Sequence, residues 1–139
     1  MINPNKYVRL AYVTALKEAT GLPVYDTRIP ISVDPVPSKY ILLHSQTLQP
    51  TATSKTCYEW ECTIVVDINS VQPQGNTSSV IVDDIQEQVI TAVESLTGIP
   101  PFQMKSKKLE NQYAQDVETD SASIQRRVLT YSHWLNRIL

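Results

Sequence analysis

Glycine is scarce in this chain: only Gly21, Gly75 and Gly98 occur in 139 residues, and this limits the nucleotide chemistry available to it. A phosphate-cradling loop and a dinucleotide-binding fingerprint each need several glycines at short, fixed spacing, so that the backbone can approach the phosphates. These three glycines are too far apart to supply either motif. No serine lies in a GxSxG elbow, and no third group is evident that would orient a base. The sequence therefore excludes the common nucleotide-binding and hydrolase motifs.

Cysteine and histidine are also few, with two residues of each type. Cys57 and Cys62 would point to opposite faces of one extended strand and so would not pair there. We expect free thiols in a reducing cytoplasm. His44 and His133 lie on different expected strands, and neither has a second ligand at a metal-binding spacing. We therefore expect histidines on sheet faces, no bound metal and no cofactor.

Acidic residues are the remaining candidates for catalysis. Glu59 and Glu61 lie on one face of an expected strand, and two neighbouring carboxylates are the minimum for general acid and base chemistry. Solvated carboxylates on a sheet face explain the pair with fewer assumptions. Because no orienting group accompanies them, we expect that the protein is not an enzyme.

Neither a basic excess nor a long apolar run is present. Twelve Lys and Arg against 14 Asp and Glu give a formal net charge of -2, which disfavours nucleic acid as the primary partner. Basic clusters at residues 105–108 and 126–127 have acids nearby and no interleaved aromatics, so we expect them to be solvated or at an interface. Apolar runs such as residues 40–43 are far shorter than the roughly 20 residues that span a bilayer. We expect no membrane segment and, without a secretory signal pattern, a protein that stays where it is made.

Hydrophobic periodicity predicts two helices. Asn3 and Pro4 form a helix start, apolar residues follow at steps of three and four, and Gly21 closes the element, which predicts a helix over residues 4–20. A polar loop with Pro73 and Gly75 leads into the second helix, which ends before Gly98. Its apolar stripe is formed by Ile81, Ile85, Val89, Val93 and Leu96.

Alternating side chains predict the strands. The clearest run is residues 57–68, where Trp60, Ile64 and Val66 fall on the buried side. Further strands are expected at residues 40–46, 104–117 and 123–135, with a short edge strand near Val24 and a polar connection at residues 47–56. The predicted fold is one α+β domain, residues 1–139: an antiparallel β-sheet of four to five strands packed with two α-helices, in the order α-β-β-α-β-β.

The last expected strand carries apolar side chains on both faces, and in a monomer such a patch indicates a partner surface. We assign the side of Val128 and Trp134 to the helices and the other side to a neighbouring subunit, although a β-bulge would reverse the two faces. The expected subunit contacts are Arg127, Tyr131, His133 and Leu135.

The layout resembles a known family in segments 22–26 (LPVYD), 37–43 (PSKYILL), 63–68 (TIVVDI) and 127–131 (RVLTY). Together with the N-terminal helix, these resemble the tail completion or tail terminator proteins of tailed bacteriophages, over nearly the whole chain. The resemblance implies a virion protein without an active site, assembled in the host cytoplasm into a ring that is usually a hexamer. It implies as partners other copies of the chain, the tail tube protein and head-completion or portal-adaptor proteins of the neck. Nucleic acid would be only the genome that passes through the lumen.

Residues 46–56 are the expected docking element for the tube or neck, because loops of this length without their own structure are often functional. The residues expected to dock are Thr51, Thr53, Ser54 and Lys55. Three alternatives stay open. The first is a head-closure, adaptor or minor tail protein, and the second is an enzyme with its site across a subunit interface. The third is a small RNA-binding module, which would need aromatic and basic side chains together on a sheet face.

Overall fold

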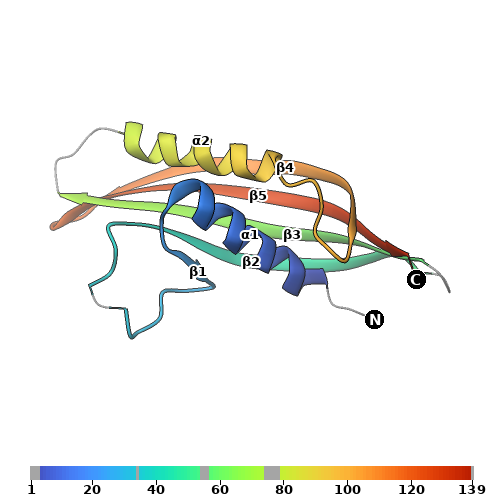
Figure 1. The fold of residues 1–139 in the computed structure, drawn as a ribbon. Helices are drawn as coiled ribbons and strands as arrows, with labels where there is room; N and C mark the ends of the chain where they lie inside the picture. The colour runs from blue at the N-terminus through green and yellow to red at the C-terminus, as the bar shows by residue number, and fades with distance from the viewer. Residues whose placement is uncertain (1–3, 34, 54–56, 74–78, 139) are drawn as a thin grey trace.

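The computed structural model describes residues 4–33, 35–53, 57–73 and 79–138. Its elements are α1 (Pro4–Thr20), β1 (Val24–Asp26), β2 (Lys39–Thr53), β3 (Cys57–Pro73), α2 (Val80–Glu94), β4 (Gln103–Glu118) and β5 (Ala122–Ile138). The strands form one sheet in the order β1-β2-β3-β5-β4, antiparallel except for the parallel pair of β1 and β2. Figure 1 shows both helices along the long axis of the sheet, and they pack on it with α1 against β2 and β3 and α2 against β3 and β5. The predicted α+β class and the two helices are confirmed.

The helices form where their apolar stripes can face the sheet. In α1, Val8, Tyr12 and Leu16 are buried at four-residue spacing, and Gly21 ends the helix with a positive φ of 67°. In α2 the buried stripe is Val82, Ile85, Val89 and Val93. The prediction of Ile81 in this stripe is wrong: the buried stripe begins at Val82, and Ile81 is 39% exposed.

The hairpin of β2 and β3 is much longer than predicted. Residues 47–53 were expected to be a connection, but they continue β2 and pair with β3 as far as Thr53 and Tyr58. The polar composition that indicated a loop suits a strand at the edge of a sheet, because β1 covers β2 only from Ile41 to Leu43. Pro50 is tolerated there because β2 is an edge strand at this position among the described residues and its pairing shifts between Pro50 and Ala52.

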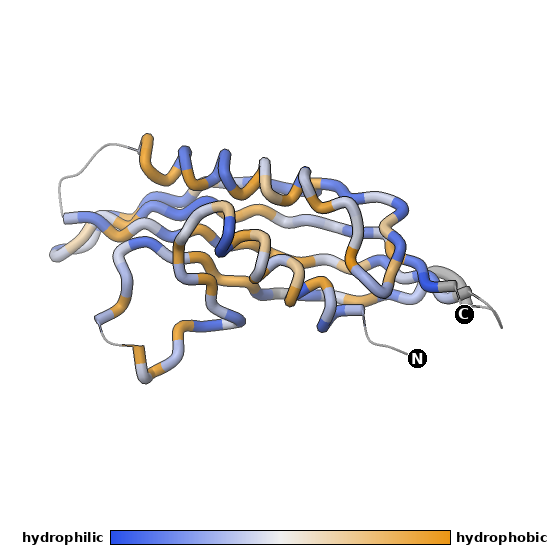
Figure 2. Tube along the Cα trace, in the orientation of Figure 1, coloured by the Kyte–Doolittle hydropathy of each residue, from blue (hydrophilic) through white to orange (hydrophobic). Residues whose placement is uncertain are grey.

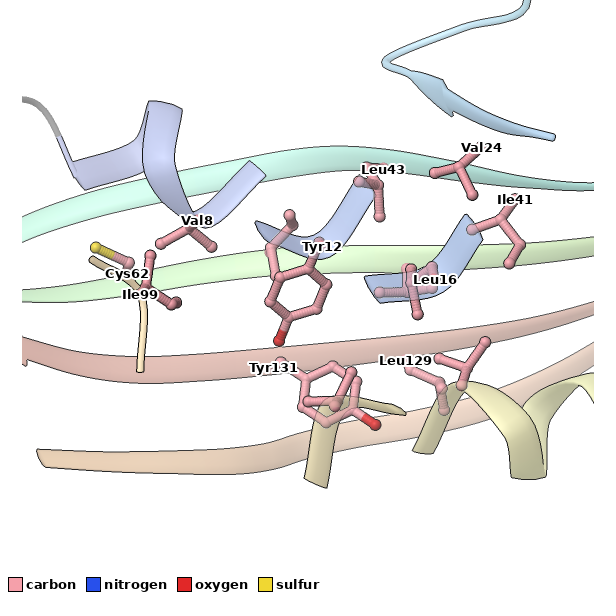
Figure 3. Packing of buried hydrophobic residues seen from close by; sticks show 14 of the residues in the cluster. Val8, Tyr12, Leu16, Val24, Ile41, Leu43, Cys62, Ile99, Leu129 and Tyr131 are labelled. Carbon is pink, nitrogen blue, oxygen red and sulfur yellow. The ribbon is translucent and has the colours of Figure 1, made fainter. Parts of the chain in front are cut away.

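The core fills the space between the helices and one face of the sheet. The predicted alternation in β3 is confirmed, because Trp60, Ile64 and Val66 are at most 1% exposed. Figure 3 shows Tyr12 of α1 pointing toward Tyr131 of β5. Burying each such side chain contributes about 1.5 to 3 kcal/mol, so this layer fixes which face of the sheet turns inward.

Candidate interaction surface

The structure reverses the predicted faces of β5. Tyr131 pairs with Ile64, His133 with Cys62 and Leu135 with Trp60, and directly opposite residues of paired strands share one face. Because that face of β3 is the core, the side chains of Tyr131, His133 and Leu135 are at most 4% exposed. The prediction that they lie on the exposed side is wrong, and Trp134 points outward instead.

Arg127 is also turned inward, and it links two elements of its own chain. Its Nε lies 3.1 Å from an Asp83 carboxylate oxygen in the first turn of α2, and its Nη1 lies 3.1 Å from Asp116 on β4. Arg127 is only 7% exposed. The prediction that Arg127 lies on an exposed contact surface is therefore wrong too. Its ion pairs instead hold the start of α2 on the sheet.

The opposite face of the sheet is covered by neither α1 nor α2 (Figure 1). We call it the open face. Three large apolar side chains on it are exposed: Trp134 at 44%, Tyr113 at 50% and Val117 at 40%. Val128 lies between them, opposite Tyr113, and its neighbours reduce its exposure to 3%. Exposed aromatic side chains on a sheet face are typical of surfaces that bind another macromolecule.

An ion pair occupies the centre of the open face. The two guanidinium donors of Arg126, Nη2 and Nε, lie 2.7 and 3.3 Å from the two carboxylate oxygens of Asp67, whose side chain is 5% exposed. Asn69 donates to the same carboxylate at 3.2 Å, and His44 Nε2 lies 3.3 Å from it. The hydrogen bond to Asp67 raises the pKa of Arg126. Asp67 is an acid in the middle of the apolar run Val65–Ile68, which was a signal for a buried charge, but its partner Arg126 is 59 residues away in the sequence.

The predicted basic clusters do not form a phosphate site. On the open face Lys105 pairs with Glu59, Lys108 lies 3.6 Å from Glu110, and Arg126 pairs with Asp67. Since an acidic side chain faces each of these three basic side chains, the open face has exposed aromatic side chains without an excess of positive charge. That pattern disfavours the RNA-binding alternative, which needs both.

Lys107 lies on the other side of β4 and caps the C-terminus of α2. Its Nζ donates to the carbonyl of Val93 at 3.1 Å, to that of Leu96 at 2.8 Å, and to that of Glu94. Carbonyls at the end of a helix have no N–H partner in a following turn, although that of Val93 also accepts the Leu96 N–H at 3.1 Å. A cation there also opposes the helix dipole.

Replacing Lys107 by methionine is expected to lower the free energy of unfolding by about 1 to 2 kcal/mol, because the cap is lost while the apolar stem is kept. Urea denaturation measures the change. Lys108→Met is the matched control, since that side chain is 71% exposed and should change stability by about 0.5 kcal/mol or less. Equal losses in both variants would contradict the capping role.

The other candidate residues are dispersed. His133 is buried, with its Nε2 2.5 Å from the Tyr12 hydroxyl, whereas His44 lies on the open face. Burial raises the pKa of the Cys62 thiol to about 12. The described residues contain no group of three or more His, Cys, Asp or Glu that would hold a metal ion. Nor is any helix in the described ranges long and apolar enough to span a bilayer.

Two of the four predicted docking residues lie at the end of β2. Thr51 and Thr53 belong to β2, so their expected place in a loop is wrong, and Ser54 and Lys55 lie outside the described residues. Trp134 belongs to the same half of the sheet, because it pairs with Glu61, which pairs in turn with Gln49 of β2. We call this half, with Trp134 exposed on it, the hairpin half.

Comparison with known proteins gives a match at the level of the fold. No protein-family model and no curated protein matches the sequence. A chain in the solved structure of the virion of a native gene transfer agent particle is similar, with a TM-score of 0.59 and 13% identity over 95% of this chain and 90% of that chain. A second solved chain, at 18% identity over 93% of this chain and 94% of that one, has a TM-score of 0.41. The first similarity shows that the two chains share a fold.

Proposed function

We propose that this chain is a structural virion protein that forms a ring, hexameric as in the family it resembles, at the head-proximal end of a phage tail. There it stops growth of the tail tube and joins the tail to the neck. The observation that carries the proposal is the open face with its exposed Trp134. The fold similarity to a chain of a gene transfer agent virion supports it.

The hairpin half is the proposed contact with the tail tube. Tryptophan is enriched among the residues that dominate binding energy at protein interfaces, and here it is presented on a rigid strand of a long sheet. Thr51 and Thr53 lie at the end of β2 in this half, and the docking role of these two and of Ser54 and Lys55, which follow in the sequence, stays a prediction. The adaptor alternative would use the same surface against the portal side of the neck.

The experiment that tests the role is light scattering of the purified chain, followed by electron microscopy with purified tail tubes. A ring of six times 15.7 kDa, or a monomer that forms caps on tube ends, supports a terminator. A chain that ignores tubes and binds portal complexes supports the adaptor. Tight, salt-sensitive retention of RNA on a filter would favour the RNA-binding module instead.

Replacing Trp134 by serine is expected to weaken capping of tube ends about tenfold or more, because a central aromatic contact is lost. Folding and ring mass should persist, since the side chain is 44% exposed. Counting capped tube ends against protein concentration measures the effect. Leu10→Ser, which removes a 54% exposed side chain from α1, is the control. Capping by Trp134→Ser at wild-type concentrations would disprove the contact.

A further inference from the structure

A proline-rich arm, residues 27–33 and 35–38, leaves the body of the protein beside β1 (Figure 1). It begins at Thr27, whose N–H donates to the Leu43 carbonyl at 2.8 Å. Farther along, Val33 N–H donates to the Pro30 carbonyl at 3.0 Å and closes a turn with Ile31 at its tip. Ile31 is 96% exposed and Val36 55% exposed, and Figure 2 shows hydrophobic positions along this projecting segment. Within the described residues nothing covers them, which indicates a partner.

The opposite edge of the sheet is formed by β4, and its two halves differ. The first half has irregular pairing between Met104 and Ser106 and again between Leu109 and Asn111, and it carries lysines at positions 105, 107 and 108. Bulges and lysines are the devices that keep an edge strand from pairing with other chains. From Asn111 to Glu118 the pairing with β5 is uninterrupted, and this stretch has no lysine or proline. The second half is therefore an unprotected edge.

The unprotected edge also has a groove and exposed apolar side chains. A groove of about 240 Å³ is lined by Gln86, Gln112, Tyr113, Ala114 and Arg127. Tyr113 and Val117 are 50% and 40% exposed on the open side of this edge. The groove opens beside α2, because Gln112 and Ala114 lie opposite the inward-facing Leu129 and Arg127. The apolar contact that this edge offers to another chain is therefore made by Tyr113 and Val117 on the open face.

The arm and this edge lie at the same height along the strands. Register runs across the sheet from Tyr25 to Leu42, Asp67, Val128 and Tyr113. The arm leaves the sheet after Asp26, one residue from this line, and returns at Lys39. Identical subunits placed side by side would thus bring the arm of one copy to this edge of the next.

We propose that in the ring the arm of each copy lies against the Asn111–Glu118 edge of its neighbour, with Ile31 packed on Tyr113 and Val117 of the open face. Arg28 is exposed on the arm and Glu118 is exposed at the end of this edge, so the two sides carry opposite charges. The contact joins different surfaces of two copies, so it repeats head to tail, and such a repeat forms a ring when the rotation between copies closes. The inference rests on the proposed ring and identifies its subunit contact. The arm's prolines limit the entropy lost on docking.

Photo-crosslinking tests the contact directly. A benzoylphenylalanine replaces Ile31, and rings or tube caps assembled from an equal mixture of light and heavy-isotope chains are irradiated and digested with trypsin. The expected product joins the arm of one chain to peptide Leu109–Arg126 of another, and mixed isotope pairs identify it as intersubunit. The same probe at Leu10, 54% exposed on α1, should not label that peptide.

Charged variants supply the second measurement. Ile31→Asp and Val117→Asp should each raise the concentration needed for ring assembly about tenfold or more, because a charge would be placed in an apolar contact. Leu10→Asp should leave it unchanged, and all three variants should melt like the wild type. An assembled ring whose crosslinks from position 31 avoid peptide Leu109–Arg126 overturns this contact and leaves the proposed function standing. A chain that forms no ring, in solution or on tubes, overturns both.

Discussion

Replacing Arg126 by methionine is expected to lower the free energy of unfolding by about 3 kcal/mol. Removing one partner of a buried ion pair costs roughly 3 to 5 kcal/mol, because the other charge stays buried without compensation. The Asp67 side chain is only 5% exposed. Its contacts with Asn69 and His44 and the 30% exposure of Arg126 place the expected loss at the lower end of that range.

A double-variant cycle separates the lost pair from the lost side chain. Asp67→Asn removes the carboxylate charge at nearly constant volume, so adding it to Arg126→Met should restore at least half of the stability lost. Urea denaturation of the four proteins gives the coupling free energy. A loss below about 1 kcal/mol in Arg126→Met, or no recovery in the double variant, would show that solvent already screens the pair.

The chain is expected to lose about 3 kcal/mol of unfolding free energy as the pH falls from 6.5 to 4. Burial, with a smaller contribution from Lys107, lowers the pKa of His133 from 6.5 to about 4. Between these values the unfolded chain binds a proton at His133 that the folded chain does not. The free energy of unfolding therefore rises with pH through this window, by about 1.4 kcal/mol per pH unit. The contribution of His133 is fully present above pH 6.5.

Urea denaturation at half-unit steps from pH 7 to 4 measures this dependence. His133→Gln should flatten the slope, because no imidazole remains to be protonated and an amide can still reach the Tyr12 hydroxyl. His44→Gln is the control for loss of a histidine on the open face. An unchanged slope in His133→Gln would assign the acid sensitivity to the carboxylates instead.

The sequence by itself determined the element types, because helix and strand periods are local properties of neighbouring residues. The spacing of Val8, Tyr12 and Leu16 places them on one side of a helix wherever that helix packs. The alternation around Trp60 likewise defines one apolar side of β3, and this side must be buried between the sheet and the helices. The misjudged stretch, residues 47–53, has polar residues that suit either a loop or an edge strand, and only its pairing with β3 distinguishes them.

Only the tertiary structure decided which side of β5 turns inward, because both sides carry apolar residues and local periodicity cannot rank them. The choice follows from register: Tyr131 lies opposite Ile64, and a shift by one residue would exchange the two faces. The same long-range pairing brings Arg126 to Asp67, 59 residues away, and Lys107 to the end of α2. Trp134 was thereby moved from the expected core to the open face, because the position of a side chain in a sheet depends on the strands beside it.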